Sequence, residues 1–273
     1  MLPLYKESRI LQETQKPWNL KDWQKFSCSF SLVCDEQKNN FFVSKELDLT
    51  IKLKPNGYIP RSGLNMVEYL NGISIQGSVV YDIGTGECGL LAYYAKARGA
   101  DKVIAIDKDV VAIIHAKTSS VISHDIFWIA GDTFSPITPA YKFDLIFSNP
   151  PQMPMQEVSL IHDYGGYDGR EVLLRILSES SQYLNKTGSL FLLIFDFLGV
   201  TKQYNTSPTI IEIANNLGLD CNVRATYQRT IRNGGKTEQN LAWIRSVYPD
   251  YKFQQAADGN LFHEMLILEC QHL

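Results

Sequence analysis

The sequence has little net charge and no long apolar run. Among its 273 residues, 26 Lys and Arg stand against 29 Asp and Glu, which gives a net charge of −3 at pH 7. No large positive field is available to hold nucleic acid by its phosphates, so nucleic acid is disfavoured as a substrate. The most apolar stretch, Leu190–Val200, is about half the ~20 residues that a membrane helix needs and contains Asp196. The charged amino terminus does not resemble a secretory signal. We therefore expect a soluble, cytoplasmic protein that does not enter a membrane.

Cysteine is scarce and shows no metal-binding spacing. No Cys-x-x-Cys pair occurs, no His stands close enough in sequence to complete a zinc site, and the five His residues show no metal spacing either. We expect no metal site, and cysteines that are reduced and mostly buried: Cys28, Cys34, Cys88, Cys221 and Cys270. The Gly-x-Ser-x-Gly elbow of serine hydrolases and the Gly-Lys-Ser/Thr of phosphate loops are also absent.

What the sequence does have is an alternation of apolar β-rich runs with segments of helical spacing, from about Gly77 onward. The expected strands are Val79–Ile83, Lys102–Ile106, Phe127–Ala130, Phe143–Ser148 and Ser189–Phe195. The expected helices are Leu90–Arg98, Val110–Val121, Glu171–Leu184 and Pro208–Leu217. Alternating strands and helices predict an α/β fold with a doubly wound, mostly parallel sheet of seven strands.

Both ends of the chain depart from this alternation. Residues 1–57 are predicted to form a small β-rich segment with strands at Phe26–Val33, Asn40–Val43 and Leu47–Leu53. Residues 58–273 would form the α/β domain. Near the carboxyl terminus, Cys221–Tyr227 and Phe262–Cys270 read as strands, and the second is expected to run antiparallel. The insert between about residues 228 and 261 is longer than an ordinary loop, so it is either functional or has structure of its own.

The first α/β strand leads into a glycine-rich turn, Asp82-Ile-Gly84-Thr85-Gly86, and then directly into a helix. Glycines at a strand-to-helix turn let a ligand approach the backbone beside a helix amino terminus. A second acid, Asp107, falls at the end of the adjacent strand, where a carboxylate can accept hydrogen bonds from both hydroxyls of a ribose. A third acid, Asp132, follows the next strand and could accept from an adenine amine, with Phe134 or a neighbour packed on the ring.

The most informative stretch is Phe143–Gln152, in which a buried strand ends in Asn149-Pro-Pro-Gln152. Two prolines fix the backbone after Asn149 and, because proline has no N–H, offer no backbone hydrogen-bond donor. The rigid loop therefore offers acceptors, namely the Asn149 side-chain oxygen and the Pro150 carbonyl. A planar NH2 group could be held there by both of its hydrogens.

Taken together, these motifs resemble class I S-adenosylmethionine-dependent methyltransferases with a Rossmann-like fold, and within them the HemK-type protein-glutamine methyltransferases. Two further segments agree: Ile59-Pro-Arg61 resembles the segment that precedes the cofactor strand in that group, and Gly165-Gly-Tyr-Asp-Gly169 resembles its stretch after the catalytic loop. The resemblance covers about half of the chain.

The resemblance implies roles for particular residues. Gly84, Thr85 and Gly86 would pass under the amino-acid part of S-adenosylmethionine, Asp107 would bind its ribose and Asp132 its adenine end. The full expected cofactor set is Asp82, Gly84, Thr85, Gly86, Asp107, Lys108, Asp132, Thr133 and Asn149. The expected catalytic set is Asn149, Pro150, Pro151 and Gln152. Candidates for clamping the substrate are Arg61, Tyr164, Tyr167 and Arg170.

Two departures from the family pattern bear on the site. Cys88 stands where a third glycine is usual, with Gly89 one place later, and Gln152 replaces the aromatic residue after the two prolines. An aromatic residue would stack on a planar amide or base, whereas Gln152 can donate and accept hydrogen bonds to a polar acceptor.

The sequence thus predicts transfer of a methyl group to a nitrogen of a protein side chain or an amino-acid-like small molecule. Three alternatives stay open. The acceptor could be the thioether sulfur of methionine, which has no proton to lose. The glycine turn could serve a nicotinamide-dependent oxidoreductase, which would leave Asn149-Pro-Pro151 unexplained. The chain could also be a catalytically silent binding module. The oligomeric state is not predictable from these residues.

Overall fold

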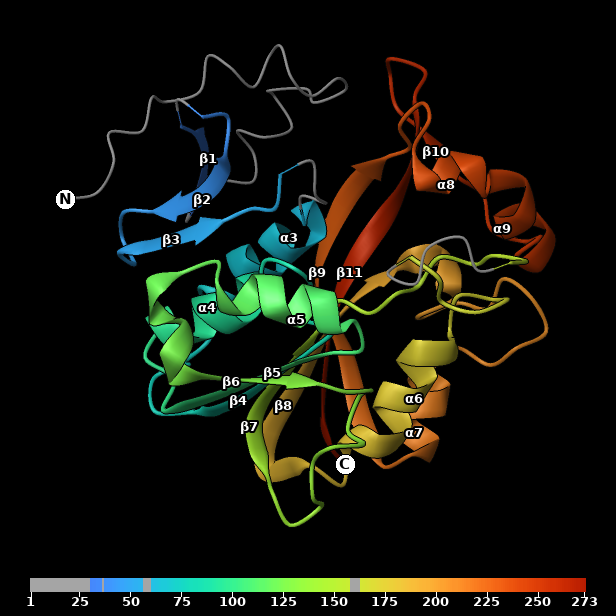
Figure 1. The fold of residues 1–273 in the computed structure, drawn as a ribbon. Coiled ribbons are helices and arrows are strands. Elements are labelled where there is room, and N and C mark those ends of the chain that lie inside the picture. The colour runs from blue at the N-terminus through green and yellow to red at the C-terminus, as the bar shows by residue number, and fades with distance from the viewer. Residues whose placement is uncertain (1–29, 36, 56–59, 158–162) are drawn as a thin grey trace. The chain divides into compact units, whose positions relative to one another are not determined.

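A computed structural model describes residues 30–35, 37–55, 60–157 and 163–273 (Figure 1). The chain divides into two compact units, of which unit 1 ends at Pro136 and unit 2 begins at Ile137. Each unit has its own strands and helices, and each is described by itself. The boundary near residue 57 that the sequence suggested stays a prediction.

Unit 1 begins with a small antiparallel sheet. Its strands are β1 (Ser31–Cys34), β2 (Asn40–Ser44) and β3 (Leu49–Lys52), paired in the order β1-β2-β3. Polar turns join them, with Lys38 and Asp48 at positive φ. The expected β-rich segment is therefore confirmed, although residues 26–29 of its first predicted strand lie outside the described part of the chain.

The rest of unit 1 alternates helices with parallel strands. In chain order these are α3 (Arg61–Leu70), β4 (Val79–Ile83), α4 (Leu90–Ala97), β5 (Lys102–Asp107), α5 (Val110–Lys117), the 3-10 turn η1 (Val121–Asp125) and β6 (Ile126–Ala130). β5 pairs in parallel with β4 on one side and with β6 on the other. The carboxyl ends of the three strands therefore lie along one edge, as the positions of Asp82, Asp107 and Asp132 in the sequence required.

Helix α5 is shorter than expected. It ends at Lys117 rather than Val121, because the hydroxyls of Thr118 and Ser119 donate to the His115 carbonyl at 3.0 and 2.8 Å. Such local bonds compete with continuation of the helix.

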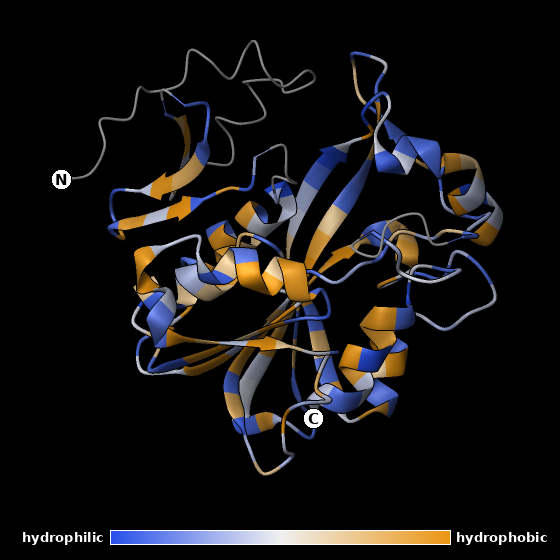
Figure 2. Ribbon diagram, viewed as in Figure 1, coloured by the Kyte–Doolittle hydropathy of each residue, from blue (hydrophilic) through white to orange (hydrophobic). Residues whose placement is uncertain are grey.

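Unit 2 carries the other expected strands and helices, some with bounds different from the predicted ones, and a 3-10 turn that was not predicted. They are β7 (Phe143–Ser148), α6 (Glu171–Ser180), β8 (Leu184–Phe195), η2 (Asp196–Leu198), α7 (Ile210–Asn216), β9 (Leu219–Thr230) and β11 (Leu261–His272). β7 and β8 are parallel, whereas β11 runs antiparallel to both β8 and β9. The α/β class and the antiparallel last strand are thus confirmed. Hydrophobic residues gather along the inner strands, while β9 alternates exposed polar with less exposed positions (Figure 2).

The insert before β11 has structure of its own. It contains α8 (Lys236–Gln239), α9 (Leu241–Val247) and the two-residue strand β10 (Gln254–Gln255), which pairs with β11. Phe197 anchors it, with its ring 5.9 Å from that of Tyr251 and 6.1 Å from that of Phe253. Aromatic side chains bury large apolar areas, so these contacts give the insert a small core on η2.

One cysteine expectation is wrong. Cys221 and Cys270 form a disulfide, because antiparallel pairing of β9 with β11 places them directly opposite each other. Cys34 and Cys88 are free and buried, as expected, and Cys28 lies outside the described residues. Within the described ranges, no helix has the length and apolar character needed to cross a membrane.

Candidate active site

The turn after β4 is shaped by two glycines. Gly84 and Gly86 have φ of +73° and +66°, which side chains other than glycine rarely adopt. Among the described residues, nothing lies within 4 Å of where a Cβ would stand on either glycine. These glycines therefore leave open space beside the backbone, which a bound group can fill.

Asp82 lies beneath this turn with one carboxylate oxygen free. Its Oδ2 accepts from Thr85 Oγ1 at 2.6 Å and from the Ala92 amide in α4 at 3.1 Å. Its Oδ1 is buried and has no partner among the described residues. Burial raises the pKa of Asp82 to about 7, opposed by the hydrogen bonds to Thr85 and Ala92. The free oxygen is suited to a ligand that donates a hydrogen bond or carries positive charge.

Asp107 ends β5 and connects neighbouring turns. Its Oδ2 accepts from the Gly86 amide and its Oδ1 from the Asp109 amide, both at 2.9 Å. Burial raises its pKa. Beside it, Lys108 forms an ion pair of 3.3 Å with Asp132. Hydrogen bonds and one ion pair thus connect the predicted residues two by two at the carboxyl edge of the unit 1 strands. The pairs are Asp82 with Thr85, Asp107 with Gly86, and Asp132 with Lys108.

The turn after β6 corrects one expectation. Phe134 is not available to pack on a ligand ring, because it is fully buried with its ring 5.5 Å from that of Tyr81. Thr133, in contrast, is held at a positive φ of 47°. Arg61, the substrate candidate in this unit, is the first residue of α3.

The shifted third glycine has a steric reason. Gly89 caps α4 with φ +61°, and a Cβ on it would stand 2.7 Å from the Trp128 ring. Cys88 is buried, and burial raises its thiol pKa to about 12. The atypical turn therefore keeps glycine where the chain has no room for a side chain.

In unit 2, Asn149 follows β7 directly and is half-buried. Among the residues that the structure describes, its side chain makes no hydrogen bond. Pro150 is buried and Pro151 is partly exposed. The loop thus presents an unengaged side-chain amide on a rigid backbone.

Gln152 does not face outward as the sequence suggested. It is only 4% exposed, its Oε1 accepts from the Phe195 amide at 2.6 Å and its Nε2 donates to the Leu193 carbonyl at 2.8 Å. The same Nε2 lies 3.3 Å from the Pro150 carbonyl. A glutamine amide has two donors and one carbonyl acceptor, so its capacity goes largely to the main chain. Gln152 therefore fastens the Asn-Pro-Pro loop to β8, and its amide is not offered to a substrate.

The glycine-rich segment 165–169 packs on this loop. The Gly165 amide donates to the Met153 carbonyl at 3.0 Å, and a Cβ on Gly165 would stand 2.4 Å from the Gln152 Cα. Tyr164 is part of the same contact, through a parallel bridge to Met153. The loop that carries Asn149 and the glycine-rich segment are therefore packed directly against each other.

Arg170 is also placed differently from a surface clamp. It is 1% exposed, donates through Nη1 to the Pro208 carbonyl at 2.9 Å and stacks 5.5 Å from the centre of the Tyr248 ring. It therefore ties the glycine-rich segment to the chain before α7 and to the insert. Of the four substrate candidates, Tyr167 is the one that is largely exposed, at 64%.

The insert supports the glycine-rich segment from outside. The Tyr248 hydroxyl donates to the Asp168 carbonyl at 2.6 Å, and Trp243 Nε1 donates to the Tyr167 carbonyl at 3.0 Å. The Tyr167 and Trp243 rings meet edge to face at 4.6 Å. Sequence reasoning missed Tyr248 and Trp243, because their side chains reach residues about 80 positions away, a pairing that no local pattern signals.

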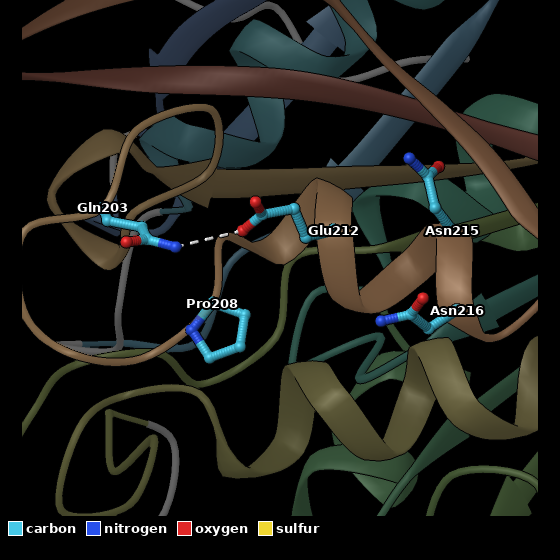
Figure 3. A pocket seen from close by; sticks show the side chains of 5 residues that line it. All are labelled: Gln203, Pro208, Glu212, Asn215 and Asn216. Carbon is cyan, nitrogen blue, oxygen red and sulfur yellow. Dashed lines mark hydrogen bonds between the residues drawn. The ribbon is translucent and has the colours of Figure 1, made fainter.

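Unit 2 also contains a cavity, one of whose lining residues, Pro208, accepts the hydrogen bond from Arg170. The cavity has a volume of about 410 Å³ and is lined by Gln203, Pro208, Glu212, Asn215 and Asn216 (Figure 3). Glu212 accepts from Gln203 there and also completes the cap of α7 with Thr209. The lining contains none of the predicted site residues.

Comparison with known families identifies the chain. Residues 65–216, more than half of the sequence, match the methyltransferase small domain. The chain belongs to this methyltransferase family. It is an enzyme, and S-adenosylmethionine is its cofactor.

Relatives and solved structures agree with this family. A protein of Methanocaldococcus jannaschii, named as a protein N5-glutamine methyltransferase, is 30% identical over 58% of this chain and 81% of its own length. A release factor glutamine methyltransferase of Gloeobacter violaceus is 26% identical over 72% of this chain and 71% of its own. The crystal structure of a methyltransferase from Pyrococcus furiosus shares the fold, with a TM-score of 0.51, 20% identity, and coverage of 84% of this chain and 91% of the other.

The residues of this methyltransferase fit the cofactor. The unpartnered Asp82 Oδ1 and the open space at Gly84 and Gly86 are what a ligand with a charged amino-acid portion requires. When bound, S-adenosylmethionine supplies an activated methyl group on a sulfonium. The protein therefore needs only to bind and orient the two reactants and to exclude water.

Proposed function

We propose that this methyltransferase methylates the side-chain amide nitrogen of a glutamine in a protein. The observation that carries the proposal is the Asn149 side chain, which makes no hydrogen bond among the described residues and stands on a loop fixed by two prolines. Relatives named as protein-glutamine and release factor glutamine methyltransferases support a protein acceptor.

The proposal assigns a role to each group of residues. In unit 1, Asp82 with Gly84, Thr85 and Gly86 binds the amino-acid end of the cofactor, and Asp107 binds the ribose. Lys108, Asp132 and Thr133 bind the adenine end. In unit 2, the Asn149 side-chain oxygen and the Pro150 carbonyl accept the two hydrogens of the acceptor amide. A carbonyl has two lone pairs, so Pro150 can accept from the substrate and from Gln152 together.

The chemistry requires alignment more than a base. With both hydrogens held, the orientation of the amide nitrogen on the Asn-Pro-Pro loop is fixed before it meets a methyl donor. The acceptor nitrogen would form a bond to the methyl carbon as the bond from that carbon to the cofactor sulfur broke, with a thioether as the leaving group, and the nitrogen would release one proton to solvent. Gln152 keeps the two acceptors in place without touching the substrate.

The methionine alternative loses part of its support. It relied on polar groups to clamp the amino-acid end of the substrate, for which the candidates were Arg61, Tyr164, Tyr167 and Arg170. The Gln152 amide is bonded to the main chain of β8, and Arg170 is buried and donates through Nη1 to the Pro208 carbonyl. The oligomeric state and the cytoplasmic location stay predictions.

Incubation with S-adenosylmethionine carrying a labelled methyl group tests the acceptor class. A protein fraction and a small-molecule fraction from the same lysate are supplied separately. The proposal expects label in protein, its loss with Asn149→Ala, and full activity with Asn222→Ala, an exposed position on β9. Label found only in a small sulfonium product, the S-methylated methionine, would instead support methionine as acceptor.

A further inference from the structure

Thr133 has an unfavourable backbone conformation in the turn that follows β6. Its φ is 47°, in the left-handed region, and its side chain is branched at Cβ. Branched residues rarely adopt this region because Cβ crowds the backbone, so the surrounding structure must hold it there. Thr133 is also buried, at 7% exposure.

The hydroxyl of Tyr81 supplies that hold. Tyr81 lies in β4 beside Asp82, is fully buried, and donates from its hydroxyl to the Thr133 carbonyl at 2.5 Å. Its ring packs on that of Phe134, with centroids 5.5 Å apart. Tyr81 therefore holds the Thr133 carbonyl through its hydroxyl and Phe134 through its ring.

The turn that Tyr81 holds also carries Asp132. Lys108 forms an ion pair with the Asp132 carboxylate at 3.3 Å, and the Ser135 amide donates to the Asp132 carbonyl at 3.0 Å. Gly131 leaves little room for a side chain, since a Cβ on it would stand 3.0 Å from Pro136 and 3.1 Å from Ile106, so the turn is closely packed at this point. Asp132 is the residue directly before Thr133, so a change in the Thr133 conformation would move Asp132.

We propose that Tyr81 is a positioning residue for cofactor binding, whose hydroxyl keeps the 131–134 turn in the shape that receives the adenine end. Tyr81 itself does not touch the cofactor. It acts through Thr133 and Asp132. The inference uses the cofactor of the family and does not depend on which acceptor the enzyme methylates.

Removal of the hydroxyl alone tests the proposal. Tyr81→Phe keeps the ring that packs on Phe134 and deletes the hydroxyl that donates to the Thr133 carbonyl. Calorimetric titration with S-adenosylhomocysteine is expected to show a dissociation constant raised about tenfold, the loss of roughly one well-placed hydrogen bond. This measurement needs neither an acceptor nor turnover.

The matched control is Tyr93→Phe. Tyr93 is equally buried, donates to the Ala116 carbonyl at 2.5 Å and packs on Trp128 with centroids 5.3 Å apart. Both variants are expected to lower the melting temperature by similar amounts, but only Tyr81→Phe should weaken cofactor binding. A dissociation constant for Tyr81→Phe within twofold of wild type, or equal weakening by Tyr93→Phe, would overturn the proposal.

A double-mutant cycle with Thr133→Gly separates positioning from general loss of stability. Glycine adopts a positive φ without crowding, so the turn no longer depends on the hydroxyl. Tyr81→Phe is then expected to change the dissociation constant by less than threefold in the Thr133→Gly background. An undiminished tenfold effect in that background would show that the hydroxyl does not act through Thr133.

Discussion

The main-chain amide of Phe195 donates to Oε1 of Gln152 at 2.6 Å. This bond, with the one from Gln152 Nε2 to the Leu193 carbonyl, connects the loop after β7 to the end of β8. The residue that replaces the family's aromatic side chain thus stabilises the loop instead of stacking on a substrate. The identity of this side chain matters for the position of Asn149 and Pro150, three and two residues earlier.

Gln152→Leu is expected to reduce kcat at least tenfold. The change leaves the Phe195 amide and the Leu193 carbonyl buried without partners, at a cost of about 1–3 kcal/mol each, so the melting temperature should also fall. Steady-state kinetics and thermal unfolding measure both effects. Gln228→Leu, at an exposed position of β9, serves as control. Wild-type kcat in Gln152→Leu would rule out a positioning role.

Cofactor affinity is expected to depend on pH through Asp82. Burial raises its pKa to about 7, so the carboxylate that binds a positively charged amino group is progressively lost below that pH. The dissociation constant of S-adenosylhomocysteine should therefore rise as pH falls from 7 to about 5.5. Asp82→Asn should bind more weakly and show a flat profile, and a slope unchanged by this substitution would assign the dependence elsewhere.

The raised pKa of Asp82 also determines how the free energy of unfolding depends on pH. Between about pH 4 and 7 the folded chain holds a proton on Asp82 that the unfolded chain has released. The contribution of Asp82 to the free energy of unfolding therefore falls as pH rises through this window and is constant above it. Comparison of wild type with Asp82→Asn by denaturant unfolding at several pH values isolates this contribution.

Tyr248→Phe is expected to raise KM for a protein acceptor several-fold while leaving cofactor affinity unchanged. The substitution removes the hydroxyl that donates to the Asp168 carbonyl and so loosens the glycine-rich segment beside Gln152. Tyr183→Phe is the control, because Tyr183 donates to the Ile137 carbonyl at 3.1 Å in the same unit. Equal effects of the two variants on KM would show that only general stability had changed.

Cys221 and Cys270 are expected to resist alkylation until a reductant is added. The pair closes a loop across a sequence separation of 49, for which the chain-entropy model gives about 4 kcal/mol of stabilisation. Cys221→Ser with Cys270→Ser should accordingly lower the melting temperature. Rapid alkylation of both residues in the untreated protein, followed by mass spectrometry, would contradict the pairing.

The sequence predicted the parts of the fold that depend on local pattern. The strand ending at Ile83, the glycine turn and the strand ending at Asp107 follow from apolar runs and glycine positions, and they were placed within a residue of the structure. The capping box of Thr209 and Glu212 shows why α7 begins at Ile210, close to the predicted start.

What the sequence could not predict depends on contacts between distant residues. The directions of Gln152 and Arg170 are set by main-chain carbonyls about 40 positions later, at Leu193 and Pro208. The disulfide depends on the register of β9 against β11, and a shift of one residue would have separated the two cysteines. Burial of Phe134 likewise follows from its packing on Tyr81, which a turn motif does not reveal.

The most direct measurement is chemical identification of the methylated atom in the acceptor. Protein labelled by the enzyme from methyl-labelled S-adenosylmethionine is hydrolysed in acid, which cleaves a methylated side-chain amide to glutamate and methylamine. The account predicts label in methylamine and, by tandem mass spectrometry of intact peptides, on a glutamine side chain. Label that remains on lysine or arginine, or that is released as methanol from a carboxyl ester, would contradict it.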